Sequence, residues 1–124
     1  MKTYKDLDIY NEGLSLFIKT HKLSLMLPKF EMYELGSQLR RSSDSIVTNI
    51  VEGYSRRTYK NDFIKFLIYS EASNNETIHH LEKLIQLYPQ MTNDLQVLKK
   101  DYEILGARIH TFINYVHHNW KINK

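Results

Sequence analysis

The stretch Leu95–Val116, LQVLKKDYEILGARIHTFINYV, carries the most regular pattern in the chain. Its core-type residues recur at alternating spacings of three and four: Leu95, Leu98, Tyr102, Leu105, Ile109, Phe112 and Val116. An α-helix has about 3.6 residues per turn, so this spacing places all of them on one helix face. Such a face is typical of a helical bundle or coiled coil.

Three further segments have a related periodicity. They run from Asp6 to Leu27, from about Glu31 to Arg56, and from about Thr58 to Tyr88. Pro28 and Pro89 end the first and third of these, because the residue before a proline avoids helical angles. Thr58 and Asn93 are expected to cap the third and fourth helices.

The core faces of these segments follow from the same spacing. On the first segment the face is expected to comprise Leu7, Tyr10, Leu14, Phe17, His21 and Leu25. On the second it comprises Leu35, Leu39, Ser43, Ile46, Ile50 and Gly53. The third has a polar middle: Phe63, Phe66, Leu67, Ser70, Asn74, Thr77, Leu81, Leu84 and Tyr88.

Short connections make sequential helices antiparallel neighbours. The sequence therefore predicts an all-α, up-down-up-down four-helix bundle, with residues 1–124 forming a single domain.

Composition narrows the class of protein. The chain has 124 residues, no cysteine and a net charge of +3. Disulfides and cysteine-ligated zinc are thereby excluded, while a mildly basic balance permits a nucleic-acid partner without requiring one. The N-terminal stretch lacks the apolar core of a signal peptide, and no run of about 18 apolar residues occurs. A cytoplasmic location without membrane contact is the expectation.

A polar stripe runs along the second predicted helix, beside its apolar face. It includes Ser45 and the residues of a predicted structural network: Gln38, Arg41, Asn49, Glu52 and Arg56. A stripe in this position is expected to be half-buried where another helix or subunit packs. Glu52 and Arg56 are four residues apart and can form an ion pair.

Basic and aromatic residues gather around the predicted turn between the second and third helices. The candidates for nucleic-acid contact are Arg40, Arg41, Arg56, Arg57, Lys60, Lys65, Tyr54 and Tyr59. Arginine forks bind phosphates and tyrosines can stack on unpaired bases. The alternative is a solvated helix end without a ligand.

No catalytic or metal site is predicted. The histidine pairs His79-His80 and His117-His118 point apart on a helix and lack the usual i,i+4 zinc spacing. Glu76 and His79 match the Glu-x-x-His spacing of a di-iron protein once, without a second pair. A metal-dependent enzyme is the weakest alternative, and no cofactor is expected.

Several stretches resemble a bacterial four-helix bundle family, first noticed as proteins encoded within intervening sequences of large-subunit ribosomal RNA genes. The accessory proteins of diversity-generating retroelements are similar. The matching pieces are Tyr4–Tyr10, Gly36–Arg57 (GSQLRRSSDSIVTNIVEGYSRR) and Asn61–Ser73. Where that family usually has glycine and leucine in its third helix, this chain has Ala72 and Asn74.

The resemblance implies a four-helix bundle that assembles as a ring, commonly a pentamer. It also implies a loosely defined association with nucleic acid and no established enzymatic activity. We therefore expect a non-enzymatic homo-oligomer that binds RNA or DNA through basic residues. The alternative is a protein-interaction scaffold for a partner protein such as a reverse transcriptase, without direct nucleic-acid contact.

Overall fold

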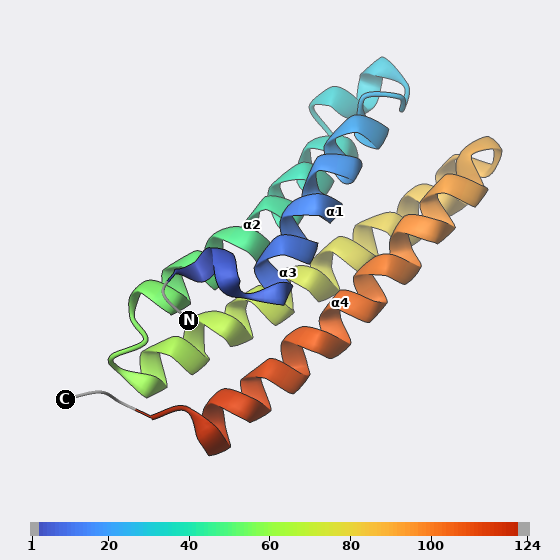
Figure 1. Cartoon of the computed structure of the whole chain (residues 1–124). Helices are drawn as coiled ribbons and strands as arrows, with labels where there is room; N and C mark the ends of the chain where they lie inside the picture. Colours follow the sequence, from blue (N-terminus) through green and yellow to red (C-terminus); the bar gives the residue numbers. More distant parts are fainter. Residues whose placement is uncertain (1–2, 122–124) are drawn as a thin grey trace.

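A computed structural model describes residues 3–121 and confirms the predicted all-α bundle (Figure 1). The four long helices are α1 (Asp8–Ser24), α2 (Leu35–Ser55), α3 (Lys60–Leu87) and α4 (Thr92–Asn119). Short 3-10 helices precede α1, α2 and α4: η1 (Tyr4–Asp6), η2 (Lys29–Met32) and η3 (Pro89–Met91). No strand occurs between residues 3 and 121.

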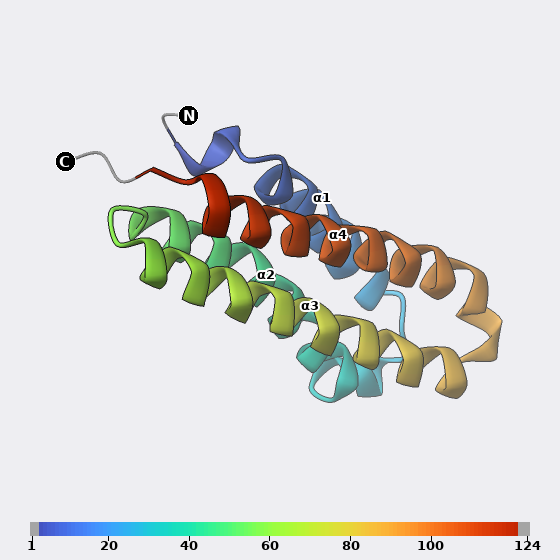
Figure 2. The same ribbon diagram turned by 90° about the horizontal axis from the view of Figure 1, so that it is seen from below.

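The helices are antiparallel in the order of the chain, and each packs against two neighbours. The contacts close a square, α1 to α2, α2 to α3, α3 to α4 and α4 back to α1. The turn between α2 and α3 lies at the same end of the bundle as η1 and the last turn of α4 (Figures 1 and 2). The α1–α2 and α3–α4 connections lie at the other end.

The predicted helix starts are wrong in detail. Neither Thr58 nor Asn93 caps a helix, because α3 begins at Lys60 after Tyr59 and α4 begins at Thr92 after Met91. Likewise α2 begins at Leu35 rather than Glu31, since the chain first forms η2.

The predicted core faces of α2, α3 and α4 are largely confirmed. All their members are buried except four half-buried residues at the edges of the core: Leu35, Phe66, Tyr88 and Phe112. The polar middle of α3 is satisfied largely from neighbouring helices. Ser70 donates to the carbonyl oxygen of Ile46 at 2.7 Å, and Thr77 donates to Ser42 Oγ at 2.8 Å.

The predicted core face of α1 is wrong by about one position. His21 and Leu25 are exposed, while the buried row is Ile9, Gly13, Leu16, Thr20 and Ser24. Small residues turn inward because α1 approaches its neighbours closely. A Cβ atom added to Gly13 would lie 3.4 Å from Val47 Cγ2 and 3.8 Å from Leu105 Cδ2.

Candidate interaction surfaces

The turn between α2 and α3 holds a stacked arginine. The guanidinium of Arg57 lies 4.1 Å from the ring centre of Tyr54 and donates to the carbonyl oxygen of Tyr54 at 3.1 Å. Tyr54 itself is only 3% exposed, so its ring supports Arg57 and faces no ligand. Tyr59, by contrast, is 71% exposed, and Lys60 beside it is half-buried. The turn thus presents one free aromatic face between two cationic side chains.

Arg56, at the end of α2, is partly neutralised. Its guanidinium lies 3.7 Å from Glu52 Oε2, 3.8 Å from Asp62 Oδ2 and 4.8 Å from the ring centre of Phe66. The Glu52 and Arg56 side chains are about half exposed, and exposed pairs of this kind contribute between about 0 and 1 kcal/mol. Replacing Glu52 is therefore expected to change the stability of the single chain very little.

Arg40 and Arg41 lie far from this turn. Sixteen residues separate Arg40 from Arg56, which corresponds to about 24 Å along a helix. Arg40 donates to Ser24 Oγ at 2.9 Å and to the carbonyl oxygen of Met32 at 2.6 Å. It thereby joins the end of α1 to η2, a structural contact that engages both terminal nitrogens of its guanidinium. The candidate residues that come together are those at the turn, Arg56, Arg57, Tyr59 and Lys60, with Lys65 one turn further along α3.

The polar stripe on α2 forms two separate groups rather than one network. Ser45 and Ser73 share a hydrogen bond of 2.9 Å across the α2–α3 contact, and Asn49 donates to the carbonyl oxygen and the hydroxyl of Ser45. Glu52 and Arg56 form the second group. Gln38 and Arg41 are exposed, and within residues 3–121 their side chains have no hydrogen-bond or ion-pair partner.

A long groove between α1 and α4 is the main feature that the sequence did not reveal. Three hollows of about 600, 400 and 330 Å³ follow one another along this contact. The first two share Glu12 and Arg108, and the last two share Lys19 and Asp101. They therefore form one continuous depression, which we call the α1–α4 groove.

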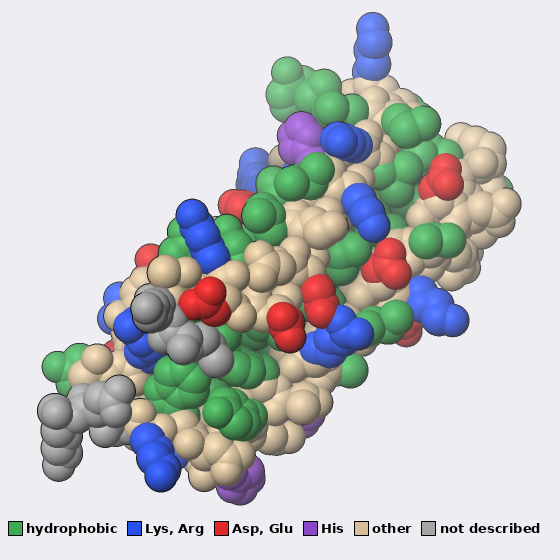
Figure 3. Space-filling model, in the orientation of Figure 1, with side chains coloured by type: hydrophobic (Ala, Val, Ile, Leu, Met, Phe, Trp, Pro, Cys, Tyr) green, Lys and Arg blue, Asp and Glu red, His purple; other side chains and the backbone are tan. Residues whose placement is uncertain are grey.

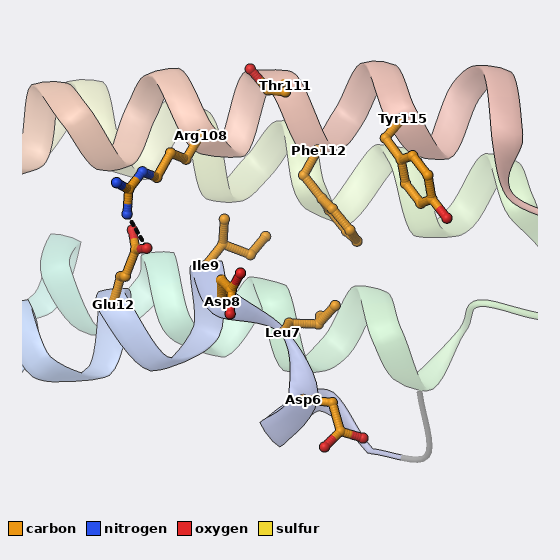
Figure 4. A pocket seen from close by; sticks show the side chains of 9 residues that line it. All are labelled: Asp6, Leu7, Asp8, Ile9, Glu12, Arg108, Thr111, Phe112 and Tyr115. Carbon is orange, nitrogen blue, oxygen red and sulfur yellow. Dashed lines mark hydrogen bonds and ion pairs between the residues drawn. The ribbon is translucent and has the colours of Figure 1, made fainter.

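Both walls of the groove carry a second helical stripe beside the core stripe. On α4 it consists of Val97, Asp101, Ile104, Arg108, Thr111 and Tyr115, again at spacings of four and three. Arg108 reaches across the groove and donates to Glu12 Oε1 (Figure 4). Apolar side chains are visible between charged ones over this face of the molecule (Figure 3). The α4 stripe is not recognisable from the sequence pattern, because charged residues interrupt its apolar members.

Perturbed ionisable groups lie outside the groove. Burial, followed by nearby Lys83, lowers the pKa of His80, whose Nε2 lies 3.7 Å from Glu76 Oε2. The hydrogen bond to Glu31 raises the pKa of Tyr88. Burial raises the pKa of Tyr102 to about 12. These groups sit in helix contacts rather than in a cleft, so they have the placement of structural groups.

No group of three or more histidine or carboxylate side chains in the described part of the chain is arranged to hold a metal ion. Of the helices between residues 3 and 121, none has both the length and the apolar character needed to cross a membrane.

Comparison with known proteins gives the fold and the family. No curated protein matches the chain. A crystal structure from Bacteroides thetaiotaomicron VPI-5482, described as a protein of unknown function from the S23 ribosomal protein family, is similar with a TM-score of 0.77. The two share 21% identity over 86% of this chain and 95% of that one, a likeness that supports the fold alone.

The sequence also matches a family model described as 23S rRNA-intervening sequence protein, over residues 5–111. The match includes α1, α2, α3 and most of α4. The chain belongs to the 23S rRNA-intervening sequence protein family.

Proposed function

We propose that this chain is a non-enzymatic, homo-oligomeric accessory module that binds RNA or DNA through the turn between α2 and α3. The observation that carries the proposal is the arrangement of Arg57, Tyr59 and Lys60 at one exposed turn. Arginine and lysine supply phosphate contacts, and an exposed tyrosine ring supplies a surface for an unpaired base.

The shape of the turn favours such a ligand. A hollow of about 510 Å³ is lined by Thr58, Tyr59, Lys60, Asn61 and Asp62. Arg57 is held in place by the Tyr54 ring and carbonyl, so it loses little freedom on meeting a phosphate. Asp62 is shared with Arg56, which leaves Lys60 as the cation that lines the hollow, with Arg57 just before it in the turn.

Repetition supports the proposal further. One turn with two such cations is a weak site, but several turns in one assembly bind a long polyanion together, so the affinity rises without new contacts.

The non-enzymatic part of the proposal rests on the ionisable groups. His110 Nδ1 and Glu71 Oε2 are 2.8 Å apart, a pairing found in catalytic dyads. Over residues 3–121, however, no serine or threonine hydroxyl is hydrogen-bonded to the His110 ring. A nucleophile would need that contact to be activated.

A salt titration tests the proposal. Fluorescence anisotropy with labelled single-stranded RNA, duplex RNA and duplex DNA gives the affinity at several salt concentrations. The double variant Arg57→Gln/Lys60→Gln should weaken binding. It should also make the slope of log K against log[salt] less negative by between about 1.4 and 1.8 for each protomer that contacts the nucleic acid, because two phosphate contacts are lost. Melting curves confirm that the variant is folded.

The matched control is Lys29→Gln/Lys100→Gln, which removes the same charge from two exposed lysines elsewhere. If both double variants weaken binding equally, the turn is not the site. If the wild-type protein binds no nucleic acid at low salt, the proposal fails, and a protein partner becomes the better explanation.

A further inference from the structure

The connection between α1 and α2 presents a concentration of exposed apolar side chains. Residues 25–33, which we call the η2 tip, carry five of the thirteen strongly exposed large hydrophobic side chains in the described part of the chain. These five are Leu25, Met26, Phe30, Met32 and Tyr33. Phe30 is 69% exposed and Met26 is 70% exposed. Apolar residues scattered singly over a surface need no explanation, but a cluster of this kind indicates an interaction site.

The η2 tip contains a single carboxylate, and the fold turns it inward. Glu31 is buried, and it accepts hydrogen bonds from the Tyr88 hydroxyl and the Gly36 backbone N–H. Successive side chains of a 3-10 helix point in different directions, because the helix has three residues per turn. Burying Glu31 therefore directs the neighbouring Phe30 and Met32 toward solvent. The tip hides the side chain that water solvates best and displays those that it solvates worst.

Hydrogen bonds hold the tip in this form. The backbone N–H of Glu31 donates to the carbonyl oxygen of Pro28 at 2.8 Å. Arg40 donates to the carbonyl oxygen of Met32 at 2.6 Å and is anchored on Ser24 Oγ at 2.9 Å. The apolar side chains are thus displayed from an ordered backbone, so little backbone freedom is lost when a partner covers them.

The charges around the tip are mainly basic. The exposed charged side chains between positions 19 and 33 are all lysines: Lys19, Lys22 and Lys29. Exposed carboxylates border this region at Glu34, directly after the tip, and at Asp94 of α4. Hydrophobic and basic side chains stand side by side at this end of the molecule (Figure 3). The excess of lysine favours an anionic partner.

The tip is a protrusion rather than a groove. The hollow beneath it, lined in part by Pro28, Lys29 and Met32, measures about 40 Å³ and has room for only a few water molecules. Protein partners usually anchor by filling a pocket with a large side chain, which this hollow cannot accept. A lipid interface has no fixed shape and closes around a projecting side chain. Tyrosine and lysine are also side chains that suit the boundary between water and lipid.

We propose that the η2 tip docks on an anionic phospholipid surface. Phe30, Met26 and Tyr33 enter the interfacial layer, while Lys22 and Lys29 meet the headgroup phosphates. The absence of a spanning helix between residues 3 and 121 bears only on crossing a bilayer, and docking on its surface needs no such helix. The expectation of no membrane contact rests on the lack of a spanning segment, whereas the tip becomes visible only in the fold.

The proposal goes beyond nucleic-acid binding and is compatible with it. The η2 tip and the α2–α3 turn lie at opposite ends of the bundle (Figure 1). One copy of the chain can therefore hold lipid at one end and nucleic acid at the other, and the two activities can be removed separately.

Vesicle flotation tests the apolar part of the surface. The wild-type protein should float with vesicles made of equal parts phosphatidylcholine and phosphatidylglycerol, and much less with pure phosphatidylcholine. Phe30→Ser should lower the partition coefficient by about tenfold, because a large apolar side chain no longer leaves water. The matched control is Tyr59→Ser, which removes a 71% exposed aromatic ring at the opposite end and should float like the wild type.

A second pair of variants tests the charges. Lys22→Gln/Lys29→Gln should weaken binding to the anionic vesicles by at least about tenfold, since each lysine near the surface contributes to the attraction. Arg57→Gln/Lys60→Gln removes the same charge from the α2–α3 turn and should still float. This control separates docking by the tip from a general attraction of the basic turn to anionic lipid.

Fluorescence reports insertion directly. The only tryptophan of the chain is Trp120, directly after α4 and at the end remote from the tip. Anionic vesicles should therefore leave the emission of the wild type unchanged, whereas the emission of Phe30→Trp should shift to shorter wavelength as the new ring enters the interface.

The opposite results overturn the proposal. They are a wild type that does not float with anionic vesicles, a Phe30→Ser or Lys22→Gln/Lys29→Gln protein that floats like the wild type, loss of flotation in either control, and a Phe30→Trp emission that does not move. If a melting curve shows that Phe30→Ser is unfolded, Met26→Ser replaces it. Phe30→Ser should bind RNA like the wild type, so failure of lipid docking is distinct from failure of nucleic-acid binding.

Discussion

At the scale of single residues, Asn74 of α3 packs closely against Gly106 of α4. Asn74 donates from Nδ2 to the carbonyl oxygen of Tyr102 at 2.9 Å. A Cβ atom added to Gly106 would lie 2.6 Å from the same Nδ2. Asn74 is fully buried, and its Oδ1 has no hydrogen-bond partner in the described part of the chain. The absence of a side chain at position 106 is thus what allows an amide at position 74.

Gly106→Ala should therefore destabilise the protein by about 1–3 kcal/mol, since the new methyl group displaces a hydrogen-bonded amide in a packed core. Urea denaturation measures the change. In the double variant Asn74→Ala/Gly106→Ala the methyl group has room. The destabilisation of the double variant should therefore be smaller than the sum for the two single variants by at least about 0.5 kcal/mol. Strictly additive effects would show that the contact is not strained.

The spacing of residues in the sequence predicts Asn74 on the core face of α3 but does not identify its partner. Helical periodicity assigns a residue to a face, because the geometry of one helix is fixed. The pairing with Gly106 depends on how deeply α3 and α4 interpenetrate, and that depth is a property of the packed bundle. Tyr54 shows the same limit, since its place beside basic residues indicated a ligand contact and the fold buried it.

At the scale of elements, a carboxylate joins two connections at one end of the bundle. Glu31 in η2 is 2% exposed. It accepts a hydrogen bond from the Tyr88 hydroxyl at 2.5 Å and one from the Gly36 backbone N–H at 3.2 Å. Gly36 lies in the first turn of α2, where an acceptor satisfies a free N–H and complements the helix dipole. The carboxylate thus fixes the start of α2 and the end of α3 together.

Tyr88→Phe should lower the free energy of unfolding, because the buried carboxylate of Glu31 loses a hydrogen-bond donor. The exposed Tyr33, 87% accessible in the α1–α2 connection that contains Glu31, gives the control Tyr33→Phe, which should be neutral within about 0.5 kcal/mol. Chemical denaturation measures both, and hydrogen exchange at Gly36 reports the start of α2. Equal stability of the two variants would remove the role assigned to Glu31.

The contact of Glu31 also explains why α2 starts later than its sequence pattern predicts. Glu31 matches a helical first turn locally, but the chain makes a better hydrogen-bonded connection by turning its carboxylate inward. The predicted core face of α1 is wrong for a related reason. The larger apolar side chains of α1 form the more obvious stripe in the sequence, but its close packing on α2 and α4 leaves room only for the smaller ones.

At the scale of the whole molecule, fold and function were predictable to different degrees. Four amphipathic segments with short connections admit few arrangements, so the bundle followed from periodicity alone. The candidate site did not, because Arg40 and Arg41 share a helix with Arg56 but lie several turns away. Residues that are several turns apart on one long helix are far apart in space, so among the candidate residues only those at the turn form a compact cluster.

The proposed function makes a prediction for the whole molecule. If several copies each contribute one α2–α3 turn, a single-stranded RNA long enough to reach several turns should bind at least about tenfold more tightly than one that reaches a single turn, because the second contact is then intramolecular. Fluorescence anisotropy measures both affinities. Equal affinity for the two lengths would show that each turn acts alone.

The even number of helices has a practical consequence for labelling. Both η1 and the last turn of α4 lie at the same end of the bundle as the α2–α3 turn (Figure 2). A fluorophore or affinity tag attached beyond either of them therefore stands next to the residues proposed to bind nucleic acid. A bulky tag there would hinder the ligand, and a polyhistidine tag would alter the local charge. The α3–α4 connection at Pro89–Met91 lies at the far end, so a reporter inserted there leaves the binding end unobstructed.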